Sequence, residues 1–225
     1  MAVMAGNWRY DSADDLPGSV PVFPLSGALL LPSGQMPLNI FEPRYIAMVD
    51  AAIAGDRLIG MIQPALGAAE SLPGAALCEI GCLGRITQFS ETGDGRYLIT
   101  LSGVSRFRIV EELATGTAYR QCRIAVDDFP DLAEPRKGEE EVDRTALLNT
   151  FRAYLQANGM EADWDSVERA SNAGLVTALS MMSPWGPLEK QALLEAPDHA
   201  TRAKTLIAIT EISLAGTEAA ASPLH

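Results

Sequence analysis

The sequence predicts an α+β protein in which a strand-rich part, residues 19–130, is followed by a helical part, residues 139–215. In the first part, apolar and polar residues alternate between glycine-containing turns, which indicates β-strands. After residue 138 apolar residues instead recur every three or four positions, as on one face of a helix. The polar stretch 131–138 contains proline and is typical of a linker. Strands followed by helices favour the α+β class.

The chain begins with an acidic lead-in, residues 1–18, which is expected to be flexible. Two strand-like runs and a short helix follow. The first run, 20–25, contains prolines, which lack the N–H needed for a sheet ladder, so it best suits an edge strand. The second run covers 36–41. The helix then starts around Pro43, since proline is favoured in a first helical turn, and ends before a glycine.

The clearest sheet signal lies between residues 77 and 113. Period-2 alternation indicates a first strand that ends at a glycine-containing hairpin turn. The return strand covers 96–101, and a further strand covers 104–110. A last strand is expected over 119–129. Hairpin-linked strands of this kind predict a mostly antiparallel sheet.

The helical part contains several short helices in succession. An apolar stripe indicates one helix over 147–155, and another covers 188–194. The residues that can cap further helices are Asp163 or Asp165, Asn172 and Asp198. Helices joined by short loops imply an antiparallel bundle. The end of the chain, 216–225, is expected to be frayed.

A series of short motifs carries a resemblance to one known family. At the start these are Phe23-Pro24-Leu25, Leu31-Pro32-Ser33-Gly34, Met36-Pro37-Leu38-Asn39-Ile40-Phe41 and Glu42-Pro43-Arg44-Tyr45. Further on they are Glu79-Ile80-Gly81-Cys82, Arg85-Ile86, Asp94-Gly95 and the run Ser102-Gly103-Val104-Ser105-Arg106-Phe107-Arg108-Ile109. In this order the motifs resemble the N-terminal, substrate-binding domain of Lon proteases.

The resemblance implies a PUA-like, mostly antiparallel β-barrel over 19–130, followed by a C-terminal α-helical bundle over 139–215. It also implies a module that binds polypeptide. The Glu-Pro-Arg-Tyr motif and the phrase at 187–195 resemble the stand-alone branch of the family, which lacks the ATPase and peptidase domains. The sequence contains no GxxxxGK[ST] phosphate loop. A non-catalytic protein is therefore expected.

Composition restricts the class of partner. The 17 basic and 29 acidic residues give a formal net charge of −12, so nucleic acid and anionic membranes are disfavoured partners. No apolar run approaches the ~20 residues of a membrane span. Three cysteines do not make a disulfide framework and suit a reducing compartment. A soluble, cytoplasmic protein is expected.

Candidates for catalysis are few. The only histidines are His199, expected in an exposed first helical turn, and the terminal His225, so a Ser-His-Asp triad lacks its base. Lys190 and Lys204 are expected on solvated helix surfaces, which disfavours a Ser-Lys dyad. We therefore assign no catalytic residue and no cofactor.

The cysteines also fall short of a metal site. Cys78, Cys82 and Cys122 are one ligand short of a structural zinc site. Free cysteine is among the most buried residue types and packs as a small apolar side chain. That interpretation is the better one here, and no metal is expected.

What remains is recognition of polypeptide by an apolar groove between barrel and bundle. Methionine and aromatic side chains adapt to varied apolar segments. For each apolar candidate an ordinary core role is the better interpretation, and a groove is the other one. The candidate residues are Met36, Phe41, Arg44, Tyr45, Met61 and Trp185. Further arginines that could flank a groove, or form surface salt bridges equally well, are Arg85, Arg106 and Arg108.

The function expected is binding of unfolded or partner polypeptide, as an adaptor in protein quality control, with an ATP-dependent protease as a further partner. An RNA-binding module is the alternative, because PUA-like barrels often bind RNA, although the net charge of −12 opposes it. A peptidase is the second alternative.

Overall fold

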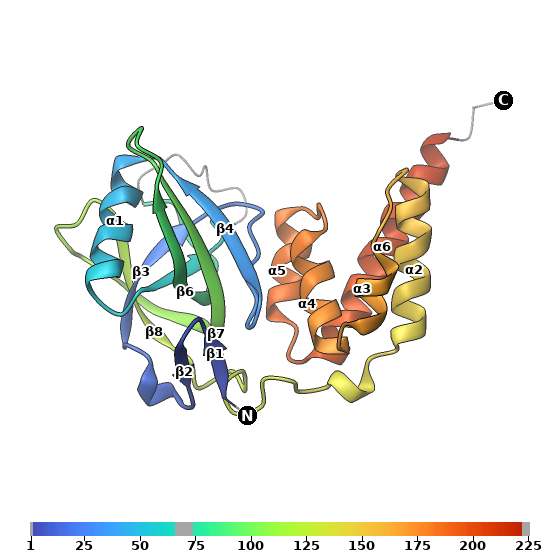
Figure 1. The fold of residues 1–225 in the computed structure, drawn as a ribbon, viewed down its shortest axis with the longest axis horizontal. Helices are drawn as coiled ribbons and strands as arrows, with labels where there is room; N and C mark the ends of the chain where they lie inside the picture. Colours follow the sequence, from blue (N-terminus) through green and yellow to red (C-terminus); the bar gives the residue numbers. More distant parts are fainter. Residues whose placement is uncertain (1, 66–73, 222–225) are drawn as a thin grey trace.

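We describe the protein from a computed structural model, in which residues 2–65 and 74–221 are described. A strand-rich half lies beside a helical half (Figure 1). The strands are β1 (Val3–Ala5), β2 (Trp8–Tyr10), β3 (Ser19–Pro24), β4 (Gln35–Ile40), β5 (Leu58–Ile62), β6 (Ile80–Glu91), β7 (Tyr97–Leu113) and β8 (Arg120–Ala125). The helices are α1 (Pro43–Ala54), α2 (Arg144–Ala157), α3 (Trp164–Arg169), α4 (Asn172–Met182), α5 (Pro187–Glu195) and α6 (His199–Ala221), with 3-10 turns η1 (Ala13–Asp15) and η2 (Glu139–Glu141). The predicted α+β class is confirmed.

The main sheet closes on itself through its longest strand, β7. Its strand order is β4-β7-β6-β5-β3-β8, and β8 pairs back onto β7. The ladder between β3 and β5 is parallel, and the other ladders are antiparallel. β4 pairs with residues 97–102 of β7, and β8 pairs with residues 108–113. Five strands therefore form a ring, and β4 is an added edge strand.

The prediction that 20–25 is an edge strand is wrong, because β3 lies between β5 and β8. The prolines are tolerated because of where each missing N–H would point. The amide of Ile124 bonds to the carbonyl of Gly18, and the amide of Leu25 bonds to the carbonyl of Ile62. The backbone N–H and C=O groups of even-numbered residues of β3 therefore point toward β8, and those of odd-numbered residues point toward β5. The backbone nitrogen of Pro21 points toward β5, but the β3–β5 ladder begins only at Val22. The backbone nitrogen of Pro24 points toward β8, but the β3–β8 ladder has already ended at Val22. Neither ladder therefore loses a donor.

The first residues are not the flexible lead-in that was expected. β1 and β2 form an antiparallel hairpin through Gly6, whose φ of 63° suits glycine. Val3, Ala5 and Tyr10 are buried. The Tyr10 hydroxyl accepts a hydrogen bond of 3.2 Å from Arg85 of β6. The other end of the chain also differs from prediction, since α6 continues to Ala221.

Helix α1 lies on the side of the strand-rich half that is turned away from helices α2 to α6, and one of its faces packs into the core (Figure 1). Its buried residues are Tyr45, Met48, Val49 and Ala52. At the start of α1, Glu42 and Arg44 form an ion pair of 2.8 Å. In the helical half, Asp143, Asp163 and Ser171 cap α2, α3 and α4 through their side chains. Ser171, and not Asn172 as predicted, is the cap of α4. Asp198 accepts a hydrogen bond of 2.7 Å from the Thr201 amide, as its predicted capping role requires.

The two halves share one apolar core. A single cluster contains Leu30 and Ile86 of the strand-rich half together with Leu179 and Leu193 of the helical half. Polar contacts add to it, because Gln63 bonds to the Pro187 carbonyl at 2.9 Å and to the Gln191 side chain at 3.0 Å. Among the described residues, no helix is long and apolar enough to cross a membrane.

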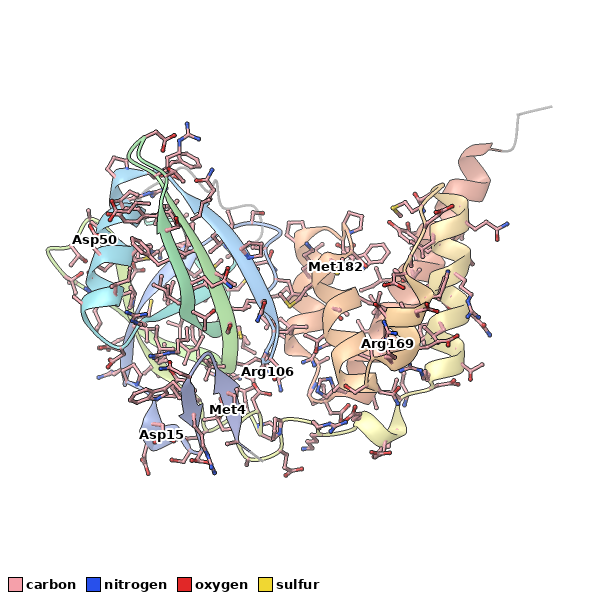
Figure 2. All side chains as sticks on the ribbon, in the orientation of Figure 1. Met4, Asp15, Asp50, Arg106, Arg169 and Met182 are labelled. Carbon is pink, nitrogen blue, oxygen red and sulfur yellow. The ribbon has the colours of Figure 1, made fainter. Side chains whose placement is uncertain are left out.

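Arg106 of β7 is the most buried polar link between the halves, and it is only 2% exposed (Figure 2). It forms a bidentate ion pair with Asp131, at 2.9 and 2.8 Å. It also donates to the carbonyls of Leu194, Ala196 and Pro197 at the end of α5. This guanidinium therefore caps the negative end of a helix from the other half. Asp131 was expected to begin a linker, but it is buried and fixed by this pair.

Candidate polypeptide-binding groove

A groove lies between the two halves, and none of the six residues predicted from the sequence lines it. Its cavity volume is about 570 Å³, within the range of roughly 300–1,000 Å³ usual for ligand pockets. Its walls come from the hairpin, the loop before β4, the segment before η2, α4 and the start of α6. We call it the boundary groove, and its lining includes Met4, Ser33, Arg136, Thr177, Met182 and His199.

Methionines give the groove its apolar surface. Met4 on β1 is 56% exposed, and Met182 at the end of α4 is 83% exposed. The two come from opposite sides of the boundary (Figure 2). Methionine is unbranched and flexible, so this lining can adapt to varied apolar side chains.

A tight loop holds one wall against α4. The Ser33 amide bonds to the Gly103 carbonyl at 2.9 Å, and the Gly34 amide bonds to the Leu31 carbonyl at 2.9 Å. A Cβ at Gly34 would overlap the sulfur of Met181 on α4. Glycine at this position therefore allows the loop and α4 to meet at the base of the groove.

His199 is part of the groove wall and is not in the exposed turn that was predicted for it. It is 8% exposed. Its amide bonds to the Lys137 carbonyl at 3.0 Å, and its Nε2 lies 3.2 Å from the Pro135 carbonyl. Burial, followed by the charge of Arg202, lowers the pKa of His199, so the imidazole is neutral at pH 7.

The charges of the groove are unusual for so acidic a protein. None of the residues that line it in the described structure is an aspartate or glutamate. Its one arginine, Arg136, is paired with Glu139 of η2. Glu139 also accepts a hydrogen bond of 3.0 Å from the Ala173 amide at the start of α4. A bound chain would therefore meet little of the negative charge that the rest of the molecule carries.

The Glu139 carboxylate makes the stability of this wall depend on pH. The Arg136 side chain, with help from the Ala173 amide, holds the pKa of Glu139 at about 2. Its folded-state pKa lies below the unfolded value, so its stabilisation is present above pH 4.5 and is lost as the pH falls toward 2. Glu139→Gln should lower the free energy of unfolding at pH 7 by about 1–2 kcal/mol, and this difference should vanish near pH 2. Urea unfolding across this pH range measures it, with the exposed Glu140→Gln as the control.

Three of the six expected groove residues meet at a different place. Phe41, Arg44 and Tyr45 line a pocket of about 530 Å³ between the end of β3 and the edge strand β4. We call it the seam pocket. Phe41 is 62% exposed, whereas Tyr45 is buried and lies 4.1 Å from the Phe23 ring, centroid to centroid. The Arg44 guanidinium lies 4.5 Å from the centre of the Tyr45 ring.

The other three expected residues line neither the boundary groove nor the seam pocket. Met61 and Trp185 are buried in the shared core, and Trp185 packs 5.3 Å from the Tyr154 ring. Met36 is partly buried against the same core. Core packing therefore accounts for these side chains, and a role for them in binding stays a prediction.

Sequence reasoning missed Met4, Met182 and His199. Met182 ends the apolar stripe of its helix, and nothing in one sequence separates the last core residue of a stripe from the first exposed one. Lys190 was expected on a solvated surface, but its Nζ donates to the Gly27 carbonyl at 2.8 Å, and burial lowers its pKa.

Two of the three cysteines pack as small apolar side chains, as expected. Cys82 and Cys122 are buried in the core, and Cys78 is half-buried. Burial raises the pKa of Cys122 to about 11. Within residues 2–65 and 74–221, no group of three or more His, Cys, Asp or Glu residues is placed to hold a metal ion.

Comparison with known proteins places this architecture in one family. Residues 19–211 match the family model of the ATP-dependent protease La (LON) substrate-binding domain. The chain is 34% identical over 201 residues to a Lon protease of Desulfosudis oleivorans and 29% identical over 202 residues to Lon protease 2 of Myxococcus xanthus. Each match covers 86% of this chain but 24% of the relative, so the chain spans about a quarter of these curated relatives.

Solved structures agree on the fold. A Lon N-terminal domain protein from Xanthomonas campestris is 21% identical and superimposes with a TM-score of 0.59, over 84% of this chain and 97% of that one. The N-terminal domain of Lon protease from the Mycobacterium avium complex is 20% identical, with a TM-score of 0.62 over 86% and 98%.

Proposed function

Because the chain belongs to the family of Lon substrate-binding domains, we propose that it binds unfolded polypeptide in the boundary groove. The observation that carries this proposal is the pair of exposed methionines, Met4 and Met182, on opposite walls of a groove without carboxylates. Exposed apolar side chains supply affinity for apolar residues of any sequence. A lining without negative charge avoids repelling acidic chains.

Binding can be measured by fluorescence anisotropy with labelled α-lactalbumin that has been reduced and carbamidomethylated, so that it stays unfolded. An acidic probe excludes simple charge attraction to this acidic protein. Met182→Lys should weaken binding by about tenfold, since it places a hydrated charge where an apolar side chain docks. Met160→Lys is the matched control, because Met160 is also exposed, at 43%, and lies outside the groove.

The same assay separates the two pockets. Phe41→Lys alters the seam pocket and should leave the affinity within about twofold, a change of roughly 0.4 kcal/mol. If Phe41→Lys weakens binding and Met182→Lys does not, the binding site moves to the seam pocket. If wild type does not bind the unfolded probe, the proposed function fails.

The finer role that we propose is that of an adaptor for an ATP-dependent protease. Its support is the family match and the relatives, which are Lon proteases. Adding this protein to a Lon protease from the same organism should change the rate at which unfolded α-lactalbumin is degraded, and the Met182→Lys variant should have less effect. An unchanged rate would contradict the adaptor role and leave the binding function standing.

A further inference from the structure

One buried polar atom in the boundary groove has no hydrogen-bond partner among the described residues. It is Nδ1 of His199, in a side chain that is 8% exposed and forms part of the groove wall. A buried polar nitrogen without a partner is uncommon, because it loses its hydration and gains nothing in return. Such an atom in the wall of a groove points to a group that arrives with a ligand.

The chemistry of the ring decides which kind of group this is. Nε2 faces the carbonyl of Pro135 at 3.2 Å. A carbonyl oxygen only accepts, so Nε2 carries the proton of the neutral imidazole. Nδ1 is then left as an acceptor, and its partner must be a donor. The tautomer is fixed by a backbone contact within the protein and does not depend on the ligand.

The surroundings restrict the donor further. Met181 and Met182 of α4 line the groove with His199. Nδ1 itself has less than 1 Å² of exposed surface, so a ligand reaches it only when a side chain of the wall moves. Methionine side chains are unbranched and flexible enough to move in this way. A polypeptide that places an apolar side chain on these methionines brings backbone N–H groups with it, and an extended chain presents them on one side at every second residue.

We infer that His199 determines specificity in the boundary groove, where its Nδ1 accepts a hydrogen bond from one backbone N–H of the bound extended chain. This inference rests on the proposed function and deepens it. The preferred segment has an apolar residue next to a free N–H, and proline is excluded at the position that supplies the N–H.

The test uses the nine-residue segment of α-lactalbumin that binds wild type most tightly, chosen from a tiled peptide array. A series of this peptide replaces one amide at a time by an ester, which removes one N–H without adding bulk. With wild type, one ester should weaken binding by about tenfold, and its neighbours should have little effect.

His199→Gln is the matched variant. The glutamine amide can keep the contact with the Pro135 carbonyl, but it offers no acceptor at the position of Nδ1. The His199→Gln protein should bind the parent peptide about tenfold more weakly than wild type does. The ester that weakens binding to wild type should cause no further loss of affinity in this variant. Met182→Lys should weaken every peptide and keep the sensitivity to that ester. The urea midpoint of each variant checks that it is folded.

The outcomes separate this inference from the proposed function. If the peptides bind wild type but no ester is special, or if His199→Gln keeps the ester sensitivity, the role of His199 is overturned and polypeptide binding stands. If wild type binds neither the array nor unfolded α-lactalbumin, both are overturned.

Discussion

Replacing Arg106 by methionine is expected to lower the free energy of unfolding by about 3–5 kcal/mol. The substitution removes a guanidinium that is 2% exposed and leaves the buried Asp131 without its counter-charge, with the residue-106 amide, at 2.8 Å, still donating to it. It also leaves the carbonyls of Leu194, Ala196 and Pro197 without this donor. A buried charge without its counter-ion is costly, because one backbone hydrogen bond does not replace the hydration that the carboxylate has lost. Urea unfolding measures the loss, and the melting temperature should fall by roughly 10 °C.

Arg108→Met is the matched control, two residues further along β7. Arg108 pairs with Glu79 at 3.0 Å and with Asp128 at 2.8 Å, but all three side chains are at least 40% exposed. Exposed pairs contribute about 0–1 kcal/mol each. Equal losses for the two variants would contradict the account of Arg106. Adding Asp131→Leu to Arg106→Met should recover part of the loss, because no unpaired charge then remains.

Replacing Gly103 by alanine is expected to cost about 3 kcal/mol or more, since the added methyl group has no room. A Cβ at Gly103 would overlap the backbone carbonyl of Leu31. This backbone cannot easily move away, because Ser33 bonds to the Gly103 carbonyl at 2.9 Å and Gly103 bonds to the Gly34 carbonyl at 2.8 Å. The added methyl group would displace the loop around Ser33, which forms one wall of the boundary groove. Affinity for the unfolded probe should therefore fall as well.

The comparison for Gly103→Ala is Gly116→Ala. A Cβ at Gly116 meets no atom within 4 Å, so this variant should unfold within about 0.5 kcal/mol of wild type. If Gly103→Ala is as stable as Gly116→Ala, the close approach between β7 and the groove wall is not as tight as described.

The strands and most helices could be predicted from sequence because their periodicity is local. The place of β3 could not, since it depends on partners. Prolines within a strand favour an edge, and only the register shows that Pro21 and Pro24 each point where no ladder partner is present. The hairpin of β1 and β2 was missed for a related reason, because strands of three residues are too short to establish a period.

The residues that line the candidate site were not predicted from the sequence. An apolar groove between the halves was expected, and none of the six residues predicted for it lines the boundary groove. Side chains such as Met61 and Met182 have the same chemistry, and burial alone separates them, at 3% and 83% exposed. Burial depends on how the helical half covers the strands. Arg106 shows the same limit. The sequence placed it among arginines that could flank a groove or form surface salt bridges, whereas in the structure it is buried and donates to carbonyls at the end of α5.

The most direct test of polypeptide binding at the boundary groove is site-specific photo-crosslinking. Two proteins are compared, one with p-benzoylphenylalanine in place of Met182 and one with it in place of Met160, each otherwise unchanged. Each is irradiated with reduced, carbamidomethylated α-lactalbumin. We expect a crosslink from position 182 that unlabelled unfolded chain competes away, and only background from position 160. Equal crosslinking from both positions, or none from position 182 while the probe binds, would contradict the assignment of the groove.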